Sequence, residues 1–196
     1  MAYTFSILKA DIADYMHRTD IPMTMITRQA EARINREVRA PETIKSVAVY
    51  PNSFGLATDC NEVISLRYPI PGGYKTLIAV GRDVYNDYLY TGGVYPEVYT
   101  LQDRLIKVAP EGSQNIEMTL TYYAIPPELT QNSHTFPLMS KNPDLYLYGC
   151  LVEAAKWAQN PELIQLYDAT YLRIKDSVNA AAADAMHGGV MQIKVA

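Results

Sequence analysis

Two acids four positions apart, Asp83 and Asp87, come closest in this chain to a catalytic pair. Paired carboxylates can act as acid and base in the hydrolysis of a glycosidic bond, and an aromatic ring such as Tyr85 could stack on a sugar between them. Glu97 is a third acid near the same tyrosine-rich segment. Carboxylates at this spacing in a polar loop are more often solvated, so the sequence gives no positive support to an enzyme, including a cell-wall hydrolase.

The other residues that could support chemistry are scattered. The histidines His17, His134 and His187 lie far apart, and none has metal-ligand spacing with cysteines or acids. We therefore expect surface or capping histidines, no metal and no cofactor. The paired glycines Gly72-Gly73 and Gly92-Gly93 lack the residues that follow in phosphate-binding loops and predict turns.

Composition narrows the class of protein. The chain has 196 residues, of which 48% are hydrophobic, so it is long enough for one good core or two small subdomains. The net charge of −4 argues against a module that binds duplex DNA, and no apolar stretch is long enough for a membrane span. Cys60 and Cys150 are isolated in the sequence, which is typical of reduced, structural cysteines in a cytoplasmic protein.

Four helices are expected, in two pairs. Asn142-Pro143-Asp144 and Asn160-Pro161-Glu162 each combine a good N-cap, a proline at the first helical position and an acid that meets the positive end of the helix dipole. The short connection between them predicts an αα-hairpin. Apolar residues at helical spacing predict a second pair near the N-terminus. The expected helices are residues 4–17, 21–39, 143–158 and 161–186.

Between the two pairs, the hydrophobic period changes to that of strands. Residues 116–123 give the cleanest signal, with apolar residues at every second position, and they predict a half-buried antiparallel sheet. Prolines and polar residues in 124–141 predict an extended crossing. The expected fold class is α+β, a four-helix body made of two helical pairs with an antiparallel sheet inserted at about 44–124, in a single domain of residues 1–187. The other expected strands are 63–68, 74–80 and 105–108.

Five of the sixteen tyrosines fall within fifteen residues, around the turn at Gly92-Gly93. They could form a stacking platform for sugars or single-stranded bases. The charges among them are mostly acidic, which does not suit a phosphate backbone, so a hairpin that covers the sheet or contacts a neighbouring subunit is favoured. Tyr90, Tyr95 and Tyr99 are our candidates for that subunit contact. The five tyrosines are Tyr85, Tyr88, Tyr90, Tyr95 and Tyr99.

Taken together, four ordered stretches resemble the head-to-tail adaptor (connector) proteins of tailed bacteriophages. Each stretch alone is a weak signal, but the ordered set is fairly specific and covers most of residues 5–187. The stretches are the charged segment 29–39, the segment 95–100 leading to 108–110, the aromatic strand and Pro-Pro exit at 120–130, and the helical segment 143–155.

The resemblance implies a non-enzymatic ring of about 12 copies beneath the portal protein. Such a ring docks the tail or nozzle protein, lines the channel through which double-stranded DNA passes, lies in the virion neck and is assembled in the host cytoplasm. A net negative charge suits a DNA conduit, because an attractive lumen would slow the passing phosphates. The alternatives are another neck ring, either a stopper or a tail terminator, and a carbohydrate-binding module that uses the tyrosine hairpin at the host surface.

Two sets of residues are candidates for contacts in such an assembly. In the tail at 188–196, residues 190–195 alternate like a strand. The tail could therefore order on assembly by adding a strand to the portal or a neighbouring subunit, although it could also be an ordinary frayed terminus. Charges on the second helix could form intersubunit ion pairs, although they could also be a solvated face. The tail residues are Val190, Met191, Ile193 and Val195, and the helix residues are Glu31, Arg33, Arg36 and Arg39.

Overall fold

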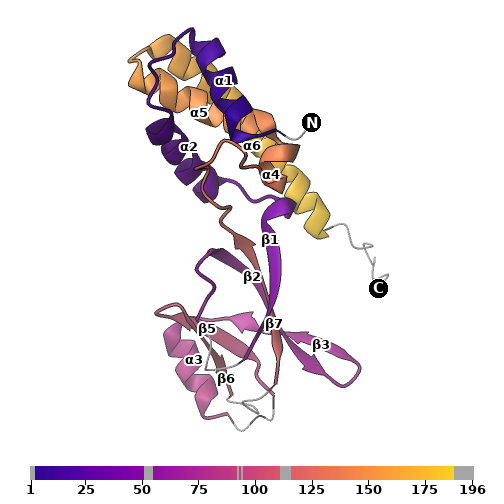
Figure 1. The fold of residues 1–196 in the computed structure, drawn as a ribbon. Coiled ribbons are helices and arrows are strands. Elements are labelled where there is room, and N and C mark those ends of the chain that lie inside the picture. Colours follow the sequence, from indigo (N-terminus) through magenta and orange to yellow (C-terminus); the bar gives the residue numbers. More distant parts are fainter. Residues whose placement is uncertain (1–2, 51–54, 92, 94, 111–115, 188–196) are drawn as a thin grey trace, which may run out of the picture. The chain divides into compact units, whose positions relative to one another are not determined.

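The computed structural model describes residues 3–50, 55–91, 93, 95–110 and 116–187, with only the backbone described at 185–187. Contacts divide the chain into two compact units, which can be followed by colour in Figure 1. Residues 1–43 and 126–196 form the helical unit, and residues 44–125 form the β unit. These bounds agree closely with the expected insertion at 44–124. That residues 1–187 behave as a single domain stays a prediction.

The helical unit contains the four expected helices, whose bounds differ by at most two residues from those predicted. A fifth helix, α4, lies in the segment that we predicted to be an extended crossing, so that prediction is wrong for residues 137–141. Pro137 occupies the start of α4, where its missing N–H costs no hydrogen bond. The elements are α1 (Phe5–Met16), α2 (Met23–Glu37), the 3-10 helix η1 (Pro41–Thr43), α4 (Pro137–Lys141), α5 (Pro143–Trp157) and α6 (Pro161–His187).

The two Asn-Pro-acid motifs behave differently. Asn160 caps α6 as predicted, because its Oδ1 accepts a hydrogen bond of 3.2 Å from the Leu163 N–H. Asn142 makes no side-chain cap bond, so the prediction for its side chain is wrong. The chain enters α5 directly from α4, and the Asn142 amide instead donates to the Leu138 carbonyl at 3.4 Å.

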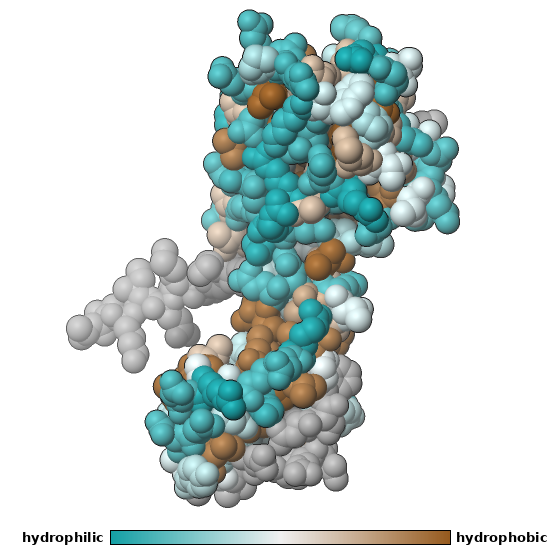
Figure 2. Space-filling view, turned by 90° about the vertical axis from the view of Figure 1, so that its left-hand side faces the viewer, coloured by the Kyte–Doolittle hydropathy of each residue, from teal (hydrophilic) through white to brown (hydrophobic). Residues whose placement is uncertain are grey.

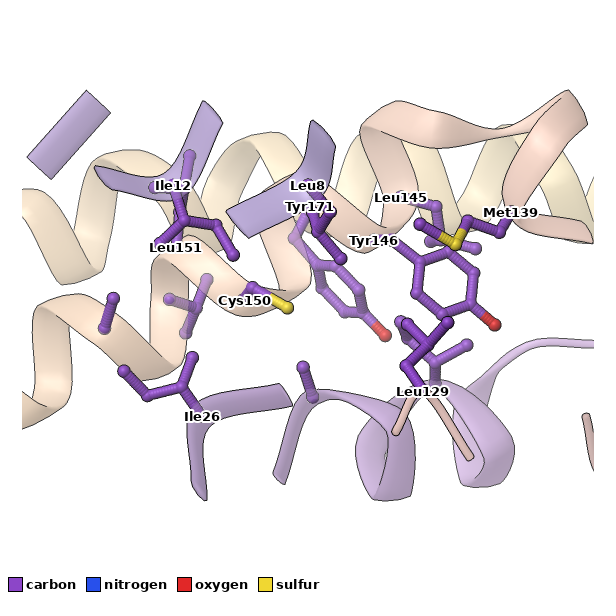
Figure 3. Close-up of a cluster of buried hydrophobic side chains, with 14 of the residues drawn as sticks. Leu8, Ile12, Ile26, Leu129, Met139, Leu145, Tyr146, Cys150, Leu151 and Tyr171 are labelled. Carbon is purple, nitrogen blue, oxygen red and sulfur yellow. The ribbon is translucent and has the colours of Figure 1, made fainter. Parts of the chain in front are cut away.

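Helix α5 forms the centre of the helical core. It contacts α1, α2, α4 and α6, and side chains from all of them meet around it in Figure 3. Leu8 and Ile12 come from α1, Ile26 from α2 and Tyr171 from α6. Nine consecutive or near-consecutive residues of α5 are buried, which is why its sequence carries only a weak one-sided pattern. They are Leu145, Tyr146, Gly149, Cys150, Leu151, Val152, Glu153, Ala154 and Ala155.

Gly149 lets the neighbouring helices approach α5 closely. A Cβ atom at this position would lie 3.4 Å from Ile34 Cδ1 on α2, 3.6 Å from Tyr171 Cε2 on α6 and 3.8 Å from Ala30 Cβ on α2. A larger side chain there would have to displace both helices.

The β unit contains two sheets. A four-stranded antiparallel sheet has the order β1-β7-β2-β3, and a three-stranded sheet has the order β4-β5-β6. The predicted alternation is confirmed in β7, where Met118, Leu120 and Tyr122 are buried. The elements are β1 (Ile44–Val49), β2 (Cys60–Ile70), β3 (Gly73–Thr76), β4 (Ile78–Ala79), α3 (Arg82–Leu89), β5 (Val98–Gln102), β6 (Leu105–Ala109) and β7 (Met118–Ala124).

Three details of the predicted sheet are wrong. The strand expected at 74–80 divides at Leu77 into β3 and β4, which belong to different sheets. β4 pairs with β5 in parallel, so the sheets are not wholly antiparallel. Residues 82–89 form helix α3 in place of one arm of a tyrosine hairpin; Asp83 in its first turn and the spacing of Tyr85 and Leu89 are the helical signals that were missed.

Both cysteines are buried free thiols, as predicted: Cys60 lies in the β unit and Cys150 in the core of the helical unit. None of the helices in the described ranges has the length and apolar character needed to cross a membrane.

The packing at Gly149 gives a stability prediction. Gly149→Leu should lower the free energy of unfolding of the helical unit by about 1–3 kcal/mol, because the side chain overfills a close helix contact. Urea unfolding followed by the fluorescence of Trp157, the single tryptophan, measures this. Ala169→Leu is the control, since Ala169 is exposed on α6, and it should change stability by less than about 0.5 kcal/mol. Equal effects of the two variants would contradict this description of the core.

Candidate interaction surfaces

Among the residues that the structure describes, the side chains that could act in catalysis do not gather into one site. Among the described residues, no group of three or more His, Cys, Asp and Glu side chains could hold a metal ion. Asp83 and Asp87 are exposed on α3, in line with the expectation of solvated acids. His17 is the left-handed C-cap residue of α1, and His134 Nδ1 accepts backbone N–H groups within a turn, so both have the local roles expected of them. The side chain of His187 lies outside the described residues.

Glu31 ties the crossing segment to α2. Its Oε1 accepts a hydrogen bond of 2.9 Å from the backbone N–H of Leu129, which is itself part of the helical core. Burial raises the pKa of Glu31 above its usual value, although the Leu129 N–H favours the charged form. This carboxylate is therefore used within the chain.

Arg33 links α2 to α6 through a salt bridge. Its Nη1 donates to Asp168 Oδ1 at 2.8 Å, and its Nε donates to Glu37 Oε1 at 3.2 Å. The guanidinium also lies over the ring of Tyr171, 4.2 Å from the centroid. Asp168 and Tyr171 are 135 or more positions away in sequence, so periodicity alone could not pair them with Arg33. With its side chain only 15% exposed, Arg33 is held within the helical unit.

Arg39 is also used within the chain, at the C-terminal end of α2. Its Nη1 donates to the carbonyls of Asn35, Arg36 and Val38, at distances between 3.0 and 3.4 Å. Asn179 on α6 makes two hydrogen bonds with the same end of α2. Its Oδ1 accepts the Arg39 N–H at 2.7 Å, and its Nδ2 donates to the Glu37 carbonyl at 3.0 Å. These bonds satisfy carbonyl groups that a helix end leaves without partners.

Arg36 differs from Glu31, Arg33 and Arg39, the other three predicted ion-pair residues. It is exposed and lines a hollow between α2, α5 and α6, together with Arg33. The nearby acids are already paired, two of them with Arg33 and Glu153 with Lys156 at 2.8 Å. In the part of the chain that the structure describes, the Arg36 side chain makes no salt bridge or hydrogen bond. It is thus the one of the four predicted ion-pair residues whose charge is presented to solvent.

The tyrosines of the β unit do not form one platform. Tyr85 and Tyr99 are buried, and the Tyr85 hydroxyl donates to the Val108 carbonyl at 3.4 Å. Tyr90 is 90% exposed, and Tyr95 is 42% exposed with its edge against the ring of Tyr68, 5.6 Å between centroids. Of the three predicted contact tyrosines, Tyr90 and Tyr95 can therefore reach a partner, whereas Tyr99 belongs to the core.

The surface in Figure 2 is largely hydrophilic over the helical unit, and hydrophobic residues reach the surface of the β unit. The exposed β-unit residues include Ile78, at 65%, and Leu101, at 45%. The predicted tail contacts Val190, Met191, Ile193 and Val195 lie outside the described residues and stay predictions.

Comparison with protein families identifies one matching family model, described as SU10 adaptor protein, which matches residues 3–192. The match spans both units and nearly the whole chain. A search of curated proteins found no match.

The buried carboxyl of Glu31 gives a pH prediction. Because its folded-state pKa lies above that of the unfolded chain, the folded state holds the proton more tightly, and stability falls as pH rises from the unfolded pKa through the folded one. Glu31→Gln keeps an acceptor for Leu129 and should remove this fall. The melting temperature of the variant, relative to that of the unchanged protein, should be higher at pH 7 than at pH 4. Asp14→Asn, at an exposed acid of α1, is the control, and an equal shift there would contradict the prediction.

The unequal use of two arginines on α2 gives a second prediction. Arg33→Ala should lower the free energy of unfolding by about 1.5–3 kcal/mol, because it removes charged hydrogen bonds to Glu37 and Asp168. Arg36→Ala should change it by less than about 0.5 kcal/mol. Urea unfolding monitored by Trp157 fluorescence measures both. If Arg36→Ala lowered the free energy of unfolding more than Arg33→Ala, the assignment of Arg33 to the fold and Arg36 to the surface would be wrong.

Proposed function

The chain belongs to the SU10 adaptor protein family, and from this membership we propose that it forms a ring that joins the portal of a phage head to the tail. The family implies a phage adaptor that meets portal and tail proteins in the virion neck, and it is a structural rather than an enzymatic class. The match over residues 3–192 is the observation that carries the proposal.

The helical unit has properties that suit a ring subunit. Its central helix is packed on several sides, and Arg33, Arg39 and Asn179 fasten α2 to α6. A body held in this way can transmit a docking geometry without rearranging. This internal fastening supports a structural role.

The exposed candidates provide lateral contacts in the proposed ring. Arg36 presents a charge that can pair with an acid of a neighbouring copy, while Tyr90 and Tyr95 present rings of the kind that is enriched in interfaces. Glu31 and Arg33 contribute indirectly, by holding the body that presents Arg36. The net charge of −4 is compatible with a channel wall that does not retain DNA.

The tail provides a further contact in this proposal. Residues 190–195 alternate like a strand, and addition to a sheet edge of the portal or of a neighbouring copy would give them hydrogen-bond partners. The core residues that the structure describes run from Phe5 to Val178, and we expect the body to fold without this segment.

The test mixes the purified protein with portal rings of its phage and images the mixture and each component by negative stain. We expect a new ring stacked on the portal, absent from either component alone. Deletion of residues 188–196 should abolish attachment and leave the urea unfolding curve of Trp157 unchanged. Arg36→Glu should weaken ring formation about tenfold or more, with Asp14→Asn as a surface-charge control.

Absence of a stacked ring with the intact protein would contradict the proposed function and favour a more distal neck ring. Normal attachment of the deleted protein would contradict the role of the tail alone.

A further inference from the structure

A groove in the β unit opens where the two sheets separate. The Leu77 N–H donates to the Leu66 carbonyl at 2.9 Å, so the chain after β3 still contacts β2 at this point. The next residues leave β2 and pair with β5 as strand β4. The hollow between the diverging strands has a volume of about 650 Å³, and it is lined by residues 60–63 of β2 on one side and residues 79–82 on the other.

One wall of this groove is a strand edge. The N–H groups of Ile78 and Val80 donate to the carbonyls of Glu97 and Tyr99, at 3.0 and 2.9 Å, so they face β5. Backbone groups of successive residues in a strand point to opposite edges, and therefore the N–H and C=O of Ala79 point away from β5. Within the described ranges, no hydrogen bond engages the Ala79 N–H. β4 is also the outer strand of its sheet, so its edge can accept another strand.

Apolar side chains accompany this edge. Leu56, Val63, Tyr99 and Leu101 line the groove, and Leu101 remains 45% exposed. Ile78 in β4 is 65% exposed. A strand edge beside apolar side chains matches what a short amphipathic strand requires, since its backbone would pair with the edge and its apolar face would be covered.

The chain itself contains a segment of that type. Met191, Ile193 and Val195 are apolar and alternate with the polar residues Gln192 and Lys194. In an extended conformation the three apolar side chains would share one face and the two polar ones the other. The six residues 190–195 would span about 20 Å, long enough to pass along the whole of the short strand β4.

We propose that the tail of one copy, residues 190–195, adds a strand to the free edge of β4 in the next copy and fills the groove between β4 and β2. The proposal rests on the proposed ring, and it names the acceptor of the tail. Each copy carries one tail and one groove on different units, so successive copies make the same heterologous contact, which is satisfied for every copy only when a ring closes.

The test uses disulfide trapping in rings assembled on portals by the full-length protein. Ala79→Cys is combined in turn with Met191→Cys, Gln192→Cys or Ile193→Cys, and the oxidised rings are separated on non-reducing gels. We expect ladders of covalently joined copies either for positions 191 and 193 or for position 192. The other face should give at least tenfold less cross-linked product, because only alternate side chains share a face. Single-cysteine variants control for bonds to Cys60, which lines the same groove.

A second pair of variants tests the faces of the tail without altering the folded body. Ile193→Asp should lower the yield of stable rings about tenfold or more, because it places a charge against the apolar side chains of Leu56, Val63 and Leu101 in the groove. Lys194→Asp, on the opposite face, should have at most a twofold effect. Equal losses would overturn the proposed orientation of the strand.

The outcomes separate this inference from the proposed function. Three results with assembled rings would overturn docking on a neighbouring β4. These are cross-links only within one chain, no cross-links at all, and tail cysteines that join only to cysteines introduced in the portal. The adaptor function would stand in each of these cases. Failure of the intact protein to form rings would overturn both.

Discussion

The burial of α5 is the constraint on which the helical unit depends. A helix in contact with α1, α2, α4 and α6 has little surface left for water, so most of the side chains that it buries are apolar or small. Gly149 marks a close contact, with Ile34 of α2 and Tyr171 of α6 both within 4 Å of where its Cβ would lie. The terminal segments of the chain therefore have to meet: α1 and α2 complete a core whose centre comes from the other end of the sequence.

This constraint also accounts for the use of charge on α2. Once α2 lies against α5 and α6, Arg33 pairs with Asp168 of α6. The Arg39 guanidinium donates to backbone carbonyls at the C-terminal end of α2. Arg36 lines a hollow with acids that are already paired with other residues, and it retains an exposed charge. A row of charges that looks uniform in the sequence thus separates into residues that hold the fold and one that can serve an interface.

Features of the fold that depend on neighbouring residues could be predicted from the sequence. Features that depend on contacts between distant residues could not. The four long helices could be predicted because the apolar spacing and prolines that define them lie within a few residues of each other. The division of the strand at Leu77 could not, because it follows from two competing partners, β2 and β5, that are distant in sequence. The pairing of Arg33 with Asp168 was missed for the same reason. The tyrosine-rich segment was misassigned because aromatic composition was weighted above the helical spacing of Tyr85 and Leu89.

We expect a stable helical body, organised by α5, to dock through surfaces that do not take part in its core. Amide hydrogen exchange of the intact protein, alone and bound to portal rings, tests it most directly. Amides of α5 should exchange slowest in both states, and binding should add protection at residues 190–195 and around Arg36 without changing exchange in α5. Fast exchange in α5, or new protection confined to the core helices on binding, would contradict it.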